Sequence, residues 1–215
     1  MNKLIIFSIS VFLLTSSSSL FSQEKEKSNA LKISPIQFGK SYFEIGYEFG
    51  INGGKSAIQI TPMIMLKRND FEEFSGIQGE LQYRNYLKRI DLEDTRAWHF
   101  TDIDIYAGAY ALGLTYQEET MYSNWDPVTQ MEFRDPIKDE IFAAEGGVFV
   151  GVKFVFSKRL CLDLLAGGGV RYSDITTENL NGGPIPMYHN SYSEVFDIGY
   201  YGVKPRLNLQ LGIIL

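Results

Sequence analysis

The amino-acid sequence predicts an all-β protein: an eight-stranded antiparallel up-and-down transmembrane β-barrel preceded by a signal peptide. Three features predict this fold class: a long hairpin in which apolar and polar residues alternate strictly, further alternating segments that bring the strand count to eight, and an apolar N-terminal leader. Alternation with a period of two is typical of strands, and no helical period of 3.6 residues extends beyond a turn or two outside the leader. Folds of the α class are therefore excluded.

The strongest pattern lies between Glu145 and Tyr172. In its first arm every second residue from Val148 to Phe156 is a valine or a phenylalanine, and after a short polar turn at 157–159 the alternation resumes. Each arm has about a dozen residues, whereas strands of soluble sheets typically have ~5–6 residues. A tilted transmembrane strand needs ~9–11 residues. The hairpin therefore favours two strands that cross a membrane.

Residues 1–22 have the features of a secretory signal peptide. Lys3 gives a positive start, Leu4–Leu14 forms an apolar core, and Thr15–Ser22 is rich in small residues before the expected cleavage point. A transmembrane helix needs about 20 residues, so this core is too short to be an anchor. Residues 23–30 are charged and have no periodicity, which predicts a disordered lead-in. The barrel domain is then expected to comprise residues 31–215.

The remaining strands are predicted from shorter alternating segments. Pro35 weakens the first of them, and Pro62 removes a ladder hydrogen bond from the third, which predicts a bulge there. Together with the two arms of the long hairpin, the count is eight. In chain order the predicted strands are residues 31–38, 42–49, 57–66, 77–87, 101–116, 145–156, 160–172 and 203–215.

The predicted connections differ in length between the two ends of the barrel. Tight turns at 52–54 and 157–159 fall on one side, and a polar connector at 88–100 is longer. Outer-membrane barrels combine long extracellular loops with short periplasmic turns, so we expect the longest connections to be extracellular. The connections on that side are residues 67–75, 117–141 and 174–201, of which the last two are the long extracellular loops.

Assigning the apolar side chains to lipid leaves a polar set that points into the barrel. An eight-stranded barrel is just wide enough for side chains to fill it, and buried charges without partners are costly. Because both signs of charge are present, we expect a mutually neutralising lumen network; a narrow ion path is the alternative. The residues predicted to form the network are Glu44, Glu48, Glu80, Arg84, Asp102, Asp104, Glu145, Lys153, Asp163, Arg171 and Arg206.

Composition excludes several other functions. The net charge of −6 and the lack of a basic patch argue against a nucleic-acid partner. The single cysteine, Cys161, cannot form an intrachain disulfide and is expected to be a structural thiol facing the lumen. Acidic residues such as Asp126 and Asp135 lack the spacing of an EF-hand, so no metal and no cofactor are expected.

Four segments of the chain together resemble a family of small outer-membrane β-barrel proteins of Gram-negative bacteria, of the OmpA and OmpX type. These segments are Asn29–Phe38, Tyr47–Glu48, Tyr83–Leu87 and Pro205–Leu215, and the resemblance covers nearly all of the mature chain. The resemblance implies a monomeric, non-enzymatic protein of the cell outer membrane. Its partners would be outer-membrane lipid and the outer-membrane assembly machinery, and its role would be structural or surface interaction through the two long loops.

Three alternatives remain open at this stage. His189 and Ser191 resemble the catalytic pair of outer-membrane lipid A deacylases, which would make the protein a lipid-modifying enzyme. A narrow pore is the second alternative. The third is a soluble ligand-binding barrel of the calycin type, in which the apolar face would point inward. The direction of the face that carries Val148 and Leu162 separates this last fold from a membrane barrel.

Overall fold

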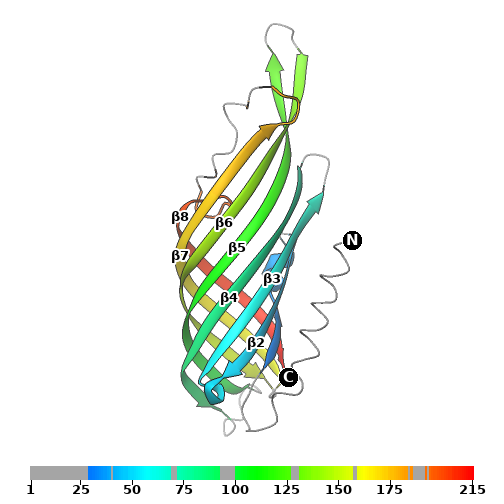
Figure 1. The fold of residues 1–215 in the computed structure, drawn as a ribbon. Helices are drawn as coiled ribbons and strands as arrows, with labels where there is room; N and C mark the ends of the chain where they lie inside the picture. Colours follow the sequence, from blue (N-terminus) through cyan, green and yellow to red (C-terminus); the bar gives the residue numbers. More distant parts are fainter. Residues whose placement is uncertain are drawn as a thin grey trace, which may run out of the picture.

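A computed structural model describes residues 29–39, 41–68, 72–92, 100–126, 131–156, 159–183, 185, 192 and 194–215. The predicted signal peptide, residues 1–22, lies outside these ranges. The strands form one closed antiparallel barrel in which each strand pairs with its neighbours in chain order and β8 pairs with β1 (Figure 1). The predicted all-β, eight-stranded up-and-down architecture is therefore confirmed. Within the described ranges, no helix is both long and apolar enough to span a bilayer.

The elements alternate in direction, so the barrel has two distinct ends. One end, here called the turn end, carries the β2–β3 and β6–β7 connections and the end of β8; the opposite end, the hairpin end, carries the β5–β6 hairpin (Figure 1). The elements are β1 (Ala30–Ile33), α2 (Pro35–Phe38), β2 (Tyr42–Ile51), η2 (Asn52–Gly54), β3 (Ser56–Arg68), β4 (Glu72–Asp91), β5 (Phe100–Asp126), β6 (Met131–Phe156), β7 (Leu160–Asn179) and β8 (Gly202–Ile214).

Apolar side chains point outward and charged side chains point inward. On the outer face, Val148, Val150 and Leu207 are 67%, 60% and 83% exposed, whereas the inward Lys153 and Asp163 are each only 1% exposed. Successive residues of a strand point to opposite faces, so the alternating sequence produces this separation directly. The orientation is the reverse of the one expected for a soluble ligand-binding barrel.

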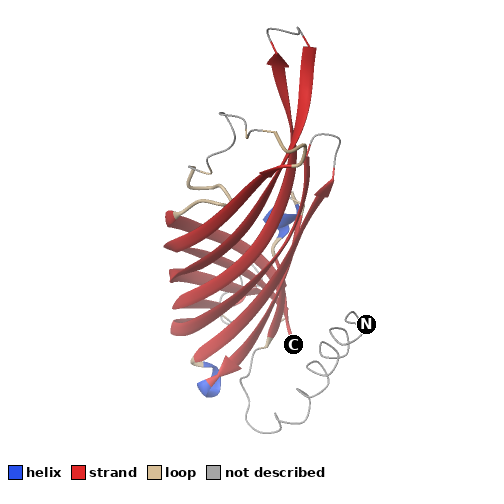
Figure 2. Cartoon of the chain, turned by 45° about the horizontal axis from the view of Figure 1, so that its top comes forward, coloured by secondary structure: helices blue, strands red, loops and turns tan. Residues whose placement is uncertain are grey.

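The predicted loop at 117–141 is wrong, because most of it is strand. β5 continues to Asp126 and β6 begins at Met131, and the two remain paired in register along this whole extension. β4 stops pairing with β5 at Thr120, and β7 stops pairing with β6 at Ile137. Beyond these points the hairpin projects from the barrel as a two-stranded ribbon (Figure 2). Polar residues on both faces hide the period of two here, which is why the sequence pattern indicated a loop.

The other predicted connections are shorter than expected for the same reason. β7 extends to Asn179, so the connection predicted at 174–201 begins only at residue 180. β3 extends to Arg68 and β4 begins at Glu72, which shortens the predicted 67–75 connection. β4 also continues to Asp91, into the predicted 88–100 connector. The predicted bulge at Pro62 is absent from the β3–β4 pairing, whose register runs unbroken through this residue.

The first predicted strand, residues 31–38, is also wrong in its second half. β1 ends at Ile33, and Pro35 instead occupies the first turn of the short helix α2. Proline suits this position because its fixed φ matches a helix and its missing N–H would have no partner there. Ala30 is buried and belongs to β1 rather than to the predicted lead-in, of which residues 23–28 lie outside the described ranges.

The barrel interior has a charged zone and an apolar zone. Tyrosines of β5 lie opposite glycines of β6, with Tyr106 paired to Gly151 and Tyr110 to Gly147, which gives each ring space to lie inside the barrel. Toward the hairpin end the interior is a hydrophobic core that includes Met63, Met65, Phe74, Leu112, Leu114, Tyr116 and Ile141.

Candidate functional site

The centre of the lumen is an ion network built around two acids. Glu48 of β2 and Asp163 of β7 are fully buried and both contact Lys32 and Arg84. The Lys32 Nζ atom lies 2.6 Å from Glu48 Oε2, and Arg84 Nη1 lies 2.9 Å from the same oxygen. Lys153 Nζ reaches the other carboxylate oxygen of Glu48 at 3.0 Å. Strands from all sides of the barrel therefore meet at this point.

Tyrosine side chains add hydrogen bonds to this network. The Tyr86 hydroxyl donates to Glu48 Oε1 at 2.8 Å, and the Tyr106 hydroxyl donates to Asp163. The Arg84 guanidinium lies over the Tyr106 ring, 4.8 Å from its centroid. These hydrogen bonds stabilise the barrel, because a charge buried without partners is strongly destabilising.

A second network lies on the hairpin side of the first. Arg206 Nη2 lies 2.6 Å from both carboxylate oxygens of Glu80, and the guanidinium stacks over the Tyr110 ring at 4.4 Å. The Tyr110 hydroxyl donates to Glu145, whose other oxygen accepts from Arg171 Nε at 2.7 Å. Together the two networks place paired charges in the middle of the lumen.

The structure brings ten of the eleven predicted lumen residues into these networks or beside them. Asp104 contacts Lys153 at 3.6 Å and Arg89 at 2.7 Å, so it joins the central network to the turn end. Glu44 is buried next to the second network. Asp102 is the exception: it lies only partly buried near the start of β5, and none of the ion pairs found among the described residues includes it. The strand reaches the rim of the barrel there, and Asp102 interacts electrostatically with Asp104 and Arg89.

The sequence did not identify Lys32, which is fully buried and contacts both central acids. Lys32 alternates with the apolar Leu31 and Ile33, which was the available signal, but β1 has only four residues and is followed by Pro35. Nor did sequence reasoning assign Tyr86 to the network. Cys161 is buried, as expected for a structural thiol facing the lumen.

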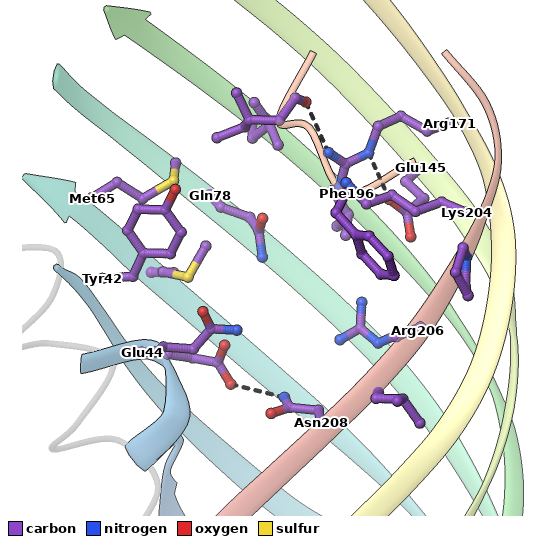
Figure 3. A pocket seen from close by; sticks show the side chains of 17 residues that line it. Tyr42, Glu44, Met65, Gln78, Glu145, Arg171, Phe196, Lys204, Arg206 and Asn208 are labelled. Atoms are coloured by element: carbon purple, nitrogen blue, oxygen red, sulfur yellow. Dashed lines mark hydrogen bonds and ion pairs between the residues drawn. The ribbon is translucent and has the colours of Figure 1, made fainter. Parts of the chain in front are cut away.

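A cavity of about 350 Å³ lies beside the second network, whose Glu145, Arg171 and Arg206 are among its lining residues (Figure 3). In this view Glu44 of β2 and Asn208 of β8 lie at its lower side, Arg206 lies on the right, and Met65 and Tyr42 form the left wall. Glu44 accepts hydrogen bonds from Gln210 at 2.8 Å and from Asn208 at 3.2 Å. The arrangement can therefore bind a polar group next to an apolar wall.

The remaining candidate residues lie largely outside the described part of the chain. His189 and Ser191, the candidate catalytic pair, both fall among the residues that the structure does not describe. In the described part, no three His, Cys, Asp or Glu side chains converge in a way that could hold a metal ion.

Comparison with protein-family models, with curated proteins and with solved structures found no match to this chain.

Proposed function

We propose that the protein is a non-enzymatic β-barrel of the cell outer membrane, with a closed lumen and a surface-exposed β5–β6 hairpin that contacts other molecules. The observation that carries this proposal is the separation of side chains across the barrel wall. Large apolar residues lie exposed on the outer face, and paired charges fill the inside.

The outer face supports a lipid environment. Residues such as Leu81, Val170 and Val203, on three different strands, are 52%, 63% and 71% exposed. Soluble monomers rarely expose continuous apolar surface of this extent. Around most of the barrel, neighbouring strands also satisfy one another's backbone hydrogen bonds, which is the requirement for strands that cross a bilayer. The resemblance to small Gram-negative outer-membrane barrels agrees with this proposal.

The lumen supports a structural role over conduction. At its centre, the buried Arg84 and Lys153 each bind a different carboxylate oxygen of Glu48, so the hydrogen-bonding groups of Glu48 are already used. Eight strands leave room for little beyond such side chains. An ion would therefore have to displace paired charges to pass.

The β5–β6 ribbon supports a role in surface interaction. Past Thr120 and Ile137 no other strand of the described residues pairs with the ribbon, and the Leu180 N–H donates to the Pro136 carbonyl oxygen at the base of one edge. The strand edges farther along the ribbon can therefore pair with another chain. Extended segments add to open strand edges through main-chain hydrogen bonds. The ribbon would lie on the extracellular side if the tight turns face the periplasm.

Cell fractionation and gel migration test the membrane proposal. We expect the protein to remain in the membrane pellet after carbonate extraction, and its unboiled form to migrate differently from its boiled form. Recovery in the soluble fraction would contradict the proposal.

Planar bilayer recording tests the closed lumen separately. We expect no discrete current steps from the purified protein, with a known porin as a positive control in the same bilayer. Reproducible conductance steps would favour a narrow pore instead.

A further inference from the structure

The barrel wall is incomplete between β8 and β2 on the hairpin side of α2. On this side β8 pairs with β1 only from Leu211 to Ile214, and β1 pairs with β2 only as far as Ile45. Within the described ranges, no strand pairs with the facing edge of β8 at residues 202–210 or with the facing edge of β2 at residues 42–44. α2 fills part of the gap, where the Ser34 hydroxyl lies 3.1 Å from the Leu209 carbonyl oxygen.

The cavity reaches the outside through this gap. Its lining includes residues from both faces of β8: Arg206 and Asn208 point inward, whereas Pro205 and Leu207 point outward. Side chains on opposite faces of one strand can border a single cavity only where the cavity passes around the strand's edge. The cavity is therefore a lateral opening beside β8.

An apolar groove on the outer wall continues from the same opening. It has a volume of about 550 Å³, and it shares Leu207 and Asn208 with the cavity. Its remaining lining residues include Ile36 of α2 and outward side chains of β5, β6 and β7, namely Ile105, Val150, Val152 and Leu164. The apolar groove on the outer wall and the polar cavity in the lumen therefore form one continuous surface.

Glu44 indicates which polar group this surface would accept. It is a buried carboxylate, 4% exposed, that lines the cavity, and its hydrogen-bond donors are the neutral amides of Asn208 and Gln210. The other acid that lines the cavity, Glu145, is instead paired with Arg171 at 2.6 Å. Arg206 lies close enough to interact electrostatically with Glu44, but its guanidinium is hydrogen-bonded to Glu80. A cationic hydrogen-bond donor is therefore the chemical complement of Glu44.

The edge of β8 adds an independent reason for a polar occupant. Backbone N–H and C=O groups that face hydrocarbon without partners cost several kcal/mol each, in the general case. Ser34 donates to the Leu209 carbonyl oxygen at the edge of β8, and no described strand pairs with this edge beside the gap. Hydrocarbon chains cannot hydrogen-bond to such an edge, but a lipid headgroup with hydrogen-bonding atoms can.

We propose that the lateral opening binds a membrane lipid with a primary-amine headgroup, whose ammonium contacts Glu44 while its hydrocarbon chain lies in the outer groove past Leu207. This inference rests on the proposed membrane location. Lys204 and Arg206 of β8 also line the cavity and give it positive charge beside a lipid phosphate, although Arg206 is already paired with Glu80.

The experiment uses the full chain folded in dodecyl maltoside micelles, with bound lipid counted by native mass spectrometry. The probes are three lysolipids that differ only in the headgroup: ethanolamine, choline and glycerol. We expect one bound lysolipid, with the ethanolamine form binding at least about tenfold more tightly than the other two, since the choline nitrogen cannot donate hydrogen bonds and the glycerol group carries no positive charge. Equal binding of the three lysolipids would overturn the proposal.

Two variants divide the site into its headgroup and chain parts. Glu44→Gln should abolish the preference for ethanolamine, and Leu207→Glu should weaken the binding of all three lysolipids. Val203→Glu is the matched control, because Val203 lies on the same outer face of β8, is 71% exposed and does not line the cavity. Unchanged preference in Glu44→Gln, or equal weakening by Val203→Glu, would contradict the site.

Two further measurements separate the possible failures. Free ethanolamine should bind far more weakly than its lysolipid; equal affinity would remove the outer groove from the site. Every variant is first checked for heat-modifiable migration, which reports a folded barrel. If the wild-type protein is soluble without detergent, the membrane proposal fails and this inference with it. If it is membrane-bound and heat-modifiable but shows no headgroup preference, only this inference fails.

Discussion

Lys32 of β1 and Asp163 of β7 form a buried ion pair although 131 positions separate them in the sequence. Their strands are not neighbours, because β8 lies between them. The pair therefore ties the four-residue β1 to the barrel across the strand that closes it. Most of the consequences that can be tested concern such contacts across the lumen.

Asp163→Asn should strongly destabilise the barrel. The substitution leaves Lys32 and Arg84 buried with less negative charge beside them, and breaking a buried ion pair by removing one partner costs about 3–5 kcal/mol. Urea unfolding in detergent micelles, followed by circular dichroism, measures this loss. The control is Glu140→Gln, which removes the exposed partner of Lys138 and should leave the midpoint unchanged. Equal midpoints for both variants would contradict a structural role for the network.

Glu80 and Arg206 should show strong energetic coupling. Each single variant, Glu80→Gln or Arg206→Met, leaves one unpaired charge in the lumen, whereas the double variant removes both. We expect the double variant to be less destabilised than the sum of the two single variants, with an interaction energy of about 1–3 kcal/mol. A double-mutant cycle of unfolding free energies measures it. Simple additivity would mean that the 2.6 Å pair contributes little.

Gly151→Ala should destabilise the barrel although it adds only a methyl group. A Cβ at this position would lie 2.3 Å from Tyr106 Cζ, so the ring that donates to Asp163 would have to move. Overpacking of this kind costs about 1–3 kcal/mol. Thermal unfolding of Gly113→Ala provides the comparison, since a Cβ there meets no atom within 4 Å. If the two alanine variants melt together, the tyrosine does not depend on the glycine for space.

Tyr192→Phe should loosen the connection between β7 and β8. The Tyr192 hydroxyl donates to Asp139 Oδ2 at 2.6 Å, and Tyr192 has a positive φ of 46°. Burial, and next the Asp139 carboxylate, raise the pKa of Tyr192 above its ordinary value of 10.0, so the contact is complete below pH 10 and is lost as the pH rises through the raised pKa.

Hydrogen exchange of the backbone amides at 194–200 measures this loosening. Exchange should be faster in Tyr192→Phe than in the wild type at neutral pH, because the connection loses its hydrogen bond to β6. Tyr172→Phe serves as the control, since the Tyr172 ring lies 55% exposed on the outer face. Similar exchange in the two variants would show that the hydroxyl does not anchor the connection.

The sequence was sufficient to predict a strand and the direction of its side chains wherever one face of the strand is apolar. Val148 and Lys153 differ in chemistry and sit on opposite faces of β6, so the period of two predicts both the strand and its orientation. The same pattern predicted that Glu48 and Asp163 share an interior, because eight strands leave no other buried place for charge.

The sequence was insufficient where both faces are polar or where the contact depends on register. Glu118 and Lys138 extend β5 and β6 beyond the apolar part of the wall, and a strand without an apolar face gives no periodic signal. The partners of Lys32 follow from the stagger of strands around a closed barrel, which no local pattern contains. The gap beside β8 follows from the early end of β1. Pro35 weakens the predicted strand in this region but does not by itself predict where β1 ends.

The short seam between β1 and β8 also governs the order of folding. Four residue pairs, from Ala30–Ile214 to Ile33–Leu211, join strands at opposite ends of the described chain, and such long-range pairing makes folding slow. Until β8 arrives, β7 carries an open edge that could pair with a second chain. Ring closure should therefore be the slow kinetic phase, and the stage at which the nascent protein most depends on a chaperone.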